Sequence, residues 1–258
     1  MPGMNLGTLP MLSGLIQAGS TPTYITRFAR SADDLRAAQS LRYAVFNVEL
    51  QEGMASSHAS GLDTDPYDEV CDHLLVEHRA TGDVVGTYRM QTGDMAGAHR
   101  GYYSEQEFEF APFESIRGRM VELGRACVHR DHRNLMVLGL LWKGIAAYVR
   151  ERGGRYLCGC SSLTSQDPAV GASAYAGLYR RHLAPAPLRT RPTPEFECPM
   201  DRLAEEAPSI PKLFRAYLAL GALICGPPAM DRQFKTIDFL TLLDLERLPA
   251  PARARFFG

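Results

Sequence analysis

The sequence predicts one α/β domain built on a mixed β-sheet with helices on both of its faces. Segments with strand and helix periodicity alternate along the chain, which favours this class. No repeat, low-complexity tract or long linker divides the 258 residues into two cores. Hydrophobic residues make up 45% and charged residues 22% of the sequence, as in ordinary globular proteins. We expect residues 1–22 to form a flexible arm and residues 23–258 one domain with a helix-strand extension from about residue 185.

The predicted order begins with a strand over Tyr24–Ala29, followed by an amphipathic helix. Ser31 is a suitable N-cap, and apolar residues recur at helical spacing from Leu35 to Val48. Residues 52–69 are rich in Gly, Ser, Asp and Pro and show no periodicity. This composition is typical of a long functional loop.

Three strands and a long helix are expected next. Residues 72–79 and 83–91 are rich in β-forming residues and flank a short glycine-containing turn, which predicts a hairpin. Residues 120–128 form a third strand of this set. The segment 135–154 has a wide apolar surface, a basic last turn and a Gly-Gly stop, as expected of a helix, and 155–163 reads as a buried strand.

The last third of the chain is predicted to add helices and one strand. Residues 172–183 form a short helix, the proline-rich stretch 184–194 is an irregular connection, and 237–245 is a strand. The segment 210–224 is an apolar helix that either packs over the sheet or rests on a membrane surface. It is shorter than the roughly 20 apolar residues that a spanning helix needs.

Bulk properties exclude several classes of protein. The net charge of -1 lacks the basic excess of a general nucleic-acid binder. Six cysteines without regular spacing indicate reduced thiols, and the N-terminus has no basic region or continuous apolar core of a secretion signal. We therefore expect a cytoplasmic protein, with peripheral contact at the inner membrane as the open alternative.

Several ordered motifs resemble those of the ornithine N-acyltransferases of ornithine-lipid synthesis. They are LRYAVFNVELQ (41–51), CDHLLV (71–76), GTYRM (86–90), VELGRACVHRDHR (121–133) and ALICGPPAMDRQFKTIDFLTLLDLERLP (222–249). These enzymes belong to the N-acetyltransferase (GNAT) superfamily and are similar in fold to acyl-homoserine-lactone synthases and N-acyl amino acid synthases. The resemblance implies a GNAT fold and an enzyme that moves a long-chain, often 3-hydroxylated acyl group from acyl carrier protein to the α-amino group of ornithine, giving a lyso-ornithine lipid.

Aminolysis of a thioester requires a base, hydrogen-bond donors and a proton source. Glu122 is the candidate base because it is an ionisable residue within an apolar strand. Arg125 lies on the opposite face unless a bulge resets the alternation, and the resemblance implies both a catalytic role for this pair and such a bulge. The alternative is a surface ion pair between them. The resemblance also implies a tyrosine that protonates the leaving thiolate, for which we take Tyr175, with Tyr179 as the other candidate.

Five further residues are expected to bind substrate. Arg42 and Phe46 share a helix face, so they suit a cation beside an aromatic wall; the alternative is ordinary packing. The acidic residues near the hairpin suit the amino groups of ornithine, and Arg89 its carboxylate. The resemblance to the homoserine-lactone enzymes pairs Asp72 with Arg89 and gives Asp68 or Glu69 the other acidic position. The alternative is an acidic loop that is simply solvated.

The acyl donor is expected to be an acyl-phosphopantetheine thioester, with no permanently bound cofactor. A glycine-rich turn before a helix binds the pyrophosphate of coenzyme A, but residues 129–139 lack glycine until Gly139. The phosphopantetheine arm of acyl carrier protein has a single phosphate and needs no pyrophosphate site, so a carrier-bound donor fits this turn better than coenzyme A. Arg130 and Arg133 are the expected carrier contacts. Further candidates are Arg150, Arg152, Arg180 and Arg181, and the alternative for each is an ordinary surface arginine.

No metal site is expected. Cys127, His129 and His132 match no metal-ligand spacing. Trp142 and its neighbours are either core or the lining of an acyl tunnel. Two alternatives to ornithine acylation remain: the same chemistry on another amine, and a catalytically silent module that binds the carrier or a lipid.

Overall fold

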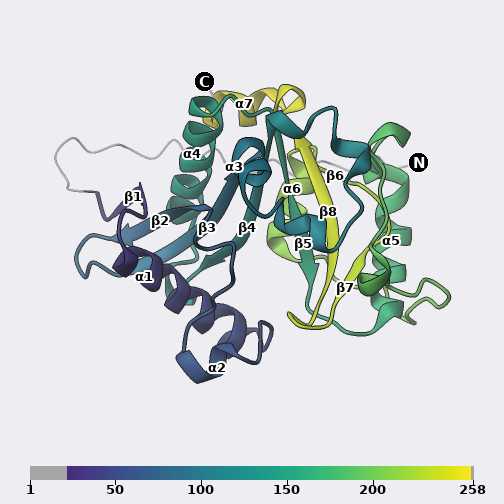
Figure 1. The fold of residues 1–258 in the computed structure, drawn as a ribbon, viewed down its shortest axis with the longest axis horizontal. Coiled ribbons are helices and arrows are strands. Elements are labelled where there is room, and N and C mark those ends of the chain that lie inside the picture. The colour runs from purple at the N-terminus through teal and green to yellow at the C-terminus, as the bar shows by residue number, and fades with distance from the viewer. Residues whose placement is uncertain (1–21, 257–258) are drawn as a thin grey trace, which may run out of the picture.

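One β-sheet organises residues 22–256, which the computed structural model describes (Figure 1). The sheet has eight strands in the order β1-β2-β3-β4-β5-β8-β6, and β7 pairs with β8. The strands are β1 (Tyr24–Phe28), β2 (Asp72–His78), β3 (Val84–Thr92), β4 (Met120–Val128), β5 (Tyr156–Leu163), β6 (Leu223–Ile224), β7 (Ala229–Asp231) and β8 (Thr236–Asp244). Every pairing is antiparallel except that of β4 with β5. The arm predicted for residues 1–22 lies, except for Pro22, outside the described residues.

Helices cover both faces of this sheet. They are α1 (Ala32–Tyr43), α2 (Ser57–Ser60), α3 (Gly93–Ala98), α4 (Leu135–Glu151), α5 (Pro168–His182), α6 (Lys212–Ala219) and α7 (Ala250–Phe256). Helix α1 packs on β3 and β4 from one face, and α4 packs on β1, β2 and β3 from the other. Helices α5 and α6 pack on the half of the sheet formed by β6 and β8. None of the helices in the described part of the chain is both long enough and apolar enough to span a lipid bilayer.

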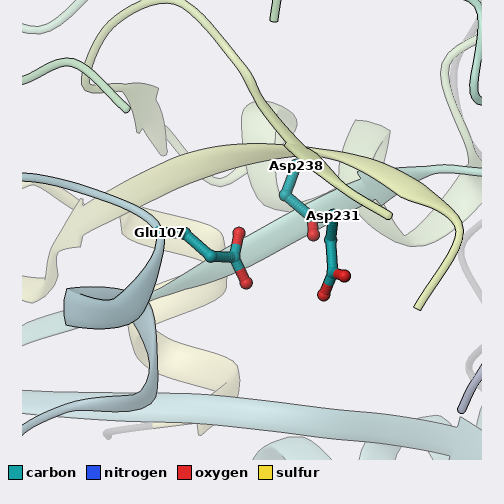
Figure 2. A group of neighbouring side chains, drawn as sticks. All are labelled: Glu107, Asp231 and Asp238. Carbon is teal, nitrogen blue, oxygen red and sulfur yellow. The ribbon is translucent and has the colours of Figure 1, made fainter. Parts of the chain in front are cut away.

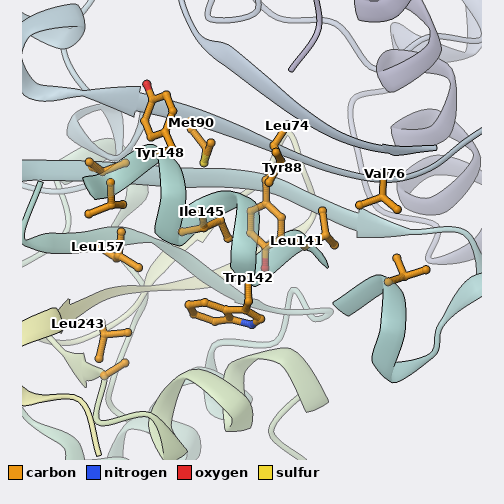
Figure 3. Close-up of a cluster of buried hydrophobic side chains, with 14 of the residues drawn as sticks. Leu74, Val76, Tyr88, Met90, Leu141, Trp142, Ile145, Tyr148, Leu157 and Leu243 are labelled. Atoms are coloured by element: carbon orange, nitrogen blue, oxygen red, sulfur yellow. The ribbon is translucent and has the colours of Figure 1, made fainter. Parts of the chain in front are cut away.

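Helix α4 shows how the sequence produces this packing. The Asn134 side chain caps the helix by accepting hydrogen bonds from the backbone of Met136 and Val137. Buried residues at i, i+4 spacing, among them Leu141 and Ile145, then face the sheet (Figure 3). Burying each such side chain contributes about 1.5–3 kcal/mol relative to leaving it exposed. This core fixes the half of the sheet that ends at β4.

The structure confirms the predicted first strand, hairpin, third strand, long helix and buried strand. Ser31 caps α1 as predicted, accepting a hydrogen bond from the backbone of Asp34. The first helix differs, because its α-helical part ends at Tyr43 and a π-helical turn follows over Ala44–Glu49. The wider turn buries three consecutive residues beginning at Val45, which one face of an α-helix does not do.

Two regions contain more structure than the sequence predicted. Between β3 and β4, the chain forms α3 and several single 3-10 turns, including Tyr103–Gln106. Such turns have no long apolar periodicity, so pattern analysis does not detect them. The C-terminal extension adds β6, β7 and α7 to the expected helix and strand, and it joins the main sheet through the pairing of β8 with β5.

Strands β4 and β5 are neighbours only at their beginnings. Their parallel pairing covers three positions, from Met120 with Tyr156 to Glu122 with Cys158. Beyond these positions β4 remains paired with β3, whereas β5 follows β8, so the sheet opens between them (Figure 1). Gly159 lies where the opening begins, with a φ of 154°. The opening is therefore built into the strand pairing.

We predict that Gly159→Ala destabilises the protein by about 3 kcal/mol. A Cβ at this position would lie 2.2 Å from the Leu123 carbonyl oxygen, and the backbone conformation disfavours any side chain. Gly177→Ala is the control, because this helical glycine has open space around it, and it should gain about 0.5–1 kcal/mol. Thermal melting of the two variants measures both effects, and equal melting temperatures would contradict the prediction.

Candidate active site

A cavity of about 310 Å³ occupies the opening between β4 and β5. It passes through the sheet, because its walls include residues from both faces. On the face of α4 and α6 the lining is apolar and includes Trp142, Leu157, Phe214, Tyr217, Ala222 and Leu243. On the face of α1 the lining is polar and includes Arg89, Ser104, Glu122, Arg125, Asp231 and Asp238. Such a cavity suits a substrate with one apolar and one polar part.

Glu122 is buried in the wall of this cavity, at the last position where β4 pairs with β5. The 3-10 turn at Tyr103 holds it: the backbone N–H groups of Tyr103 and Ser104 donate to its two oxygens at 2.7 and 2.8 Å, and Ser104 Oγ donates at 2.6 Å. Burial raises the pKa of Glu122, and these three hydrogen bonds only partly offset that effect. The carboxylate is thus fixed in place and more basic than an exposed one.

Arg125 occupies the bulge that the resemblance implied. The pairing of β3 with β4 shifts by one residue between Gly124 and Cys127, and Arg125 has a φ of 49°. Its guanidinium group packs over the rings of Tyr103 and Phe234, at 4.9 and 4.5 Å from their centroids. The bulge therefore brings Arg125 to the cavity beside Glu122.

A buried ion network lies next to this bulge. It contains three arginines and three aspartates: Arg42, Arg89, Arg125, Asp63, Asp65 and Asp68. Arg42 binds Asp68 bidentately, at 2.9 and 2.6 Å, and Arg89 reaches the same carboxylate at 3.0 Å. Burial alone would raise the pKa of Asp68, but the arginines hold it well below its usual range. The three positive and three negative side chains of the network therefore balance one another in charge.

This network changes the expected substrate contacts. Arg42 does not lie over the cavity, because Asp63 and Asp68 hold it in the interior, whereas Phe46 does line the cavity wall. Arg89 lines the cavity too, but its guanidinium is already paired with Asp65 and Asp68. Sequence analysis missed Asp63 and Asp65. The sequence did contain a signal for them, because Asp63, Asp65 and Asp68 lie close together in the loop 52–69, which was predicted to be functional.

The structure separates Asp72 from Arg89, which were together expected to hold the amino acid. Asp72 pairs with Met90 across the hairpin, one position from Arg89, so the two side chains point to opposite faces of the sheet. Its carboxylate accepts a hydrogen bond from Tyr148 on α4 at 2.8 Å. Asp68, expected to bind the amino groups of the substrate, does not line the cavity, because Arg42 and Arg89 hold it in the ion network. Glu69 is exposed to solvent.

Tyr175 does not lie on the cavity, which corrects its expected role as proton donor. It packs on α5 beside Tyr179, with ring centroids 5.6 Å apart. Tyr103 and Tyr217 line the cavity instead. The hydroxyl of Tyr217 lies 2.6 Å from that of Tyr88.

The two arginines expected to meet a carrier lie before α4. Arg130 is exposed, whereas Arg133 is paired with Glu49 at 2.6 and 2.8 Å and also donates to a backbone carbonyl. The first two residues of α4, Leu135 and Met136, are 63% and 57% exposed. The surface at this helix start is therefore apolar with basic residues beside it.

Three acidic residues form a second polar feature that sequence analysis missed. Glu107, Asp231 and Asp238 are all buried, and each offers an oxygen within 4.8 Å of the others (Figure 2). Burial raises the pKa of Glu107, and it raises the pKa of Asp238 to about 6, with the neighbouring acids adding to both effects. We call these residues the acid cluster. These three residues offer a cation site. The expectation of no metal rested on Cys127, His129 and His132 and did not consider them.

We predict that Asp238→Asn makes the protein more stable at pH 8. An acid whose pKa is about 6 when folded, against 3.8 as the reference, binds its proton more tightly in the folded state. The charged form therefore costs stability above pH 6, about 3 kcal/mol, and wild-type stability rises as pH falls from about 6 to 4. Melting temperatures at pH 8 and pH 5 measure this. Asp244→Asn is the control and should lose stability at pH 8, because Arg155 lowers the pKa of Asp244 against the effect of burial. A lower melting temperature for Asp238→Asn at pH 8 would contradict the prediction.

Comparison with known proteins places this geometry in a family. A model of the acetyltransferase (GNAT) domain matches residues 41–143. Among solved structures, FeeM, an N-acyl amino acid synthase from uncultured soil microbes, superposes with a TM-score of 0.54 at 12% identity, covering 91% of this chain and 95% of that one. The acyl-homoserine-lactone synthase LasI gives a TM-score of 0.50, also at 12% identity, with the same two shares. The predicted GNAT fold is confirmed.

Curated relatives are more similar in sequence. The chain is 34% identical over 244 residues to the L-ornithine N(alpha)-acyltransferase of Rhodobacter capsulatus, covering 90% of this chain and 93% of that protein. The protein of the same name from Agrobacterium fabrum is 33% identical over 89% of this chain and 84% of its own length. The chain therefore belongs to the L-ornithine N(alpha)-acyltransferase family, whose members are acyltransferases with the GNAT fold.

Proposed function

We propose that this enzyme transfers a long-chain acyl group from acyl carrier protein to the α-amino group of L-ornithine. The observation that carries the proposal is the position of Glu122, a buried carboxylate at the point where β4 and β5 separate and the cavity begins. The names of the curated relatives support ornithine as the acceptor.

The thioester is expected to lie between β4 and β5. Beyond Glu122 and Cys158 the facing edges of these two strands do not pair with each other, so their backbone groups are free to bind an extended amide-containing arm. The acyl chain extends into the apolar part of the cavity near Trp142 and Tyr217, on the α4 face. Of the two roles expected for Trp142, we therefore adopt the lining of an acyl tunnel rather than ordinary core packing.

A carrier protein is the donor that best fits the start of α4. The N–H groups of a free helix terminus bind pyrophosphate, but Asn134 already accepts hydrogen bonds from two of them, at 3.0 Å each. The exposed apolar residues Leu135 and Met136, with Arg130 nearby, suit the surface of an acidic carrier. Arg133 serves to hold Glu49 in this interpretation rather than to bind the carrier directly.

The chemistry follows from the position of Glu122. Its carboxylate takes a proton from the α-ammonium group, and the neutral amine attacks the thioester carbon. The C–N bond forms as the C–S bond breaks. The nitrogen then loses its second proton, which goes to the leaving thiolate to give the free thiol, and Glu122 releases the first proton to solvent. A raised pKa suits this role, because a stronger base removes the proton more readily.

Mass spectrometry of the products tests the proposal. The enzyme is mixed with a 3-hydroxyacyl carrier protein and an equimolar pool of amino acids, and we expect acyl-ornithine. Glu122→Gln should lower the rate by about 100-fold or more while the protein stays folded, as measured by circular dichroism. Formation of a different acyl-amine would support the acyl-transfer reaction but exclude ornithine as the acceptor. Carrier binding without any product would favour the silent module.

A pH profile separates a base from a structural carboxylate. Ser104 Oγ stabilises the charged form of Glu122, so Ser104→Ala should raise the pKa of that carboxylate further. Because the base works only when deprotonated, the acidic limb of kcat/KM should move to higher pH. The backbone hydrogen bonds to Glu122 remain in this variant, which keeps the site in place. An unchanged acidic limb, with activity lowered equally at all pH values, would assign Glu122 a structural role.

A further inference from the structure

The acid cluster takes no part in the chemistry proposed for Glu122, although two of its members, Asp231 and Asp238, line the same cavity. Glu107 follows the 3-10 turn that holds Glu122, Asp231 ends β7 and Asp238 lies on β8. Their side chains extend toward a common space between these segments (Figure 2). They are 1%, 5% and 3% exposed, respectively. Three carboxyl groups gathered in the interior are costly unless something positive accompanies them.

The hydrogen bonds made by the cluster leave two fully buried oxygens without a donor. Asp231 Oδ1 accepts from the backbone of Gln233 and Phe234, both at 2.8 Å. Asp238 Oδ2 accepts from Thr236 at 3.0 Å, and Glu107 Oε2 accepts from the Cys160 thiol at 3.5 Å. Two of the remaining oxygens, Glu107 Oε1 and Asp238 Oδ1, are fully buried and have no hydrogen-bond partner. Buried acceptors of this kind point to a donor that arrives with a ligand.

The described residues place no cation in direct contact with the acid cluster, and the more distant charge of Arg125 only partly offsets the effect of burial on the pKa of Glu107. Among the ion pairs of the described residues, none involves a member of the acid cluster. The cavity arginines, Arg89 and Arg125, are paired with aspartates of the ion network, and both pack over the Tyr103 ring. The polar part of the cavity is therefore left with an excess of carboxyl groups. A ligand that completes it is positively charged.

The cluster is also linked to the proposed base. The Cys160 thiol contacts both Glu107 and Ser104, and Ser104 donates to Glu122. Asp231 and Asp238 line the same cavity as Glu122. A molecule with two amino groups on a short saturated chain can therefore place one at Glu122 and the other at the cluster.

We infer that the acid cluster binds the side-chain ammonium group of the acceptor amino acid and so selects a diamine; this inference rests on the proposed function. An ammonium group has three N–H donors, and three acceptors at about 2.8 Å from its nitrogen lie about 4.6 Å apart. The oxygens of the cluster, within 4.8 Å of one another, accommodate that arrangement. A site built around buried polar groups strongly rejects an analogue that leaves them unpaired.

The test compares two acceptors, ornithine and norvaline, which differ only in the side-chain amino group. Steady-state rates with a 3-hydroxyacyl carrier protein give kcat/KM for each acceptor. We expect the wild-type protein to prefer ornithine by about 100-fold or more. Glu107→Gln and Asp238→Asn should each lower kcat/KM for ornithine by about 10-fold to 100-fold, mainly through KM, and leave the slow rate with norvaline unchanged.

Glu52→Gln is the matched control. Glu52 is a buried carboxyl group on the same cavity wall that is hydrogen-bonded to Thr164 and lies outside the cluster, so its loss should keep the preference for ornithine. Melting temperatures at pH 8 verify that each variant is folded.

Three results overturn the inference, and they are distinguishable. If the wild-type protein forms acyl-ornithine and the cluster variants keep its full preference over norvaline, the inference fails and the proposed function stands. If the wild-type protein forms no acyl-ornithine, both fail together. If EDTA abolishes activity, Mg²⁺ or Ca²⁺ restores it, and norvaline serves as well as ornithine, the cluster holds a metal ion instead.

Discussion

The parallel ladder between β4 and β5 is three residue pairs long, and the arrangement of the site depends on where it ends. A longer ladder would close the cavity and pair the strand edges that the thioester is expected to use. Two local features hold the opening at this position. Gly159 permits the close approach of β5 to the Leu123 carbonyl, and the bulge at Arg125 turns β4 away along β3. Each depends on a backbone conformation that few residues adopt at low cost.

Charge is distributed unevenly on the polar side of this opening. The ion network satisfies its own arginines and aspartates, and it fixes the loop 52–69, which has little regular structure apart from α2. Removing one partner from such a network leaves a buried charge, which typically costs about 3–5 kcal/mol. The acid cluster is the opposite case, since no ion pair of the described residues reaches it and two of its buried oxygens have no hydrogen-bond partner. A balanced network is typical of a structural element, and an unbalanced cluster is typical of a binding site.

The fold was predictable because its main elements have strong periodicity. The apolar spacing of α4 and the β-rich segments of the hairpin each identify one element. The site was predictable only in part. Glu122 could be identified because it is an ionisable residue in an apolar strand. Asp72 and Arg89 are also polar residues in strands, but only the strand register shows that they face opposite sides of the sheet. Glu107 follows a 3-10 turn in a segment without periodicity, and Asp231 and Asp238 meet it only through the pairing of β7 with β8.

The passage of the cavity through the sheet has a consequence for release of the product. Leu243 and Trp142 contact it on one face, and Glu122 and Asp238 on the other, so an acylated amino acid would be threaded between two strands with its tail and head group on opposite sides. Neither end has to be pulled through. Strands β4 and β5 diverge toward their C-terminal ends, so the gap between them is open along one side. A molecule that lies across the sheet can therefore leave through this open side. Under the proposed function, a bulky group at either end of the product would then not hinder its release.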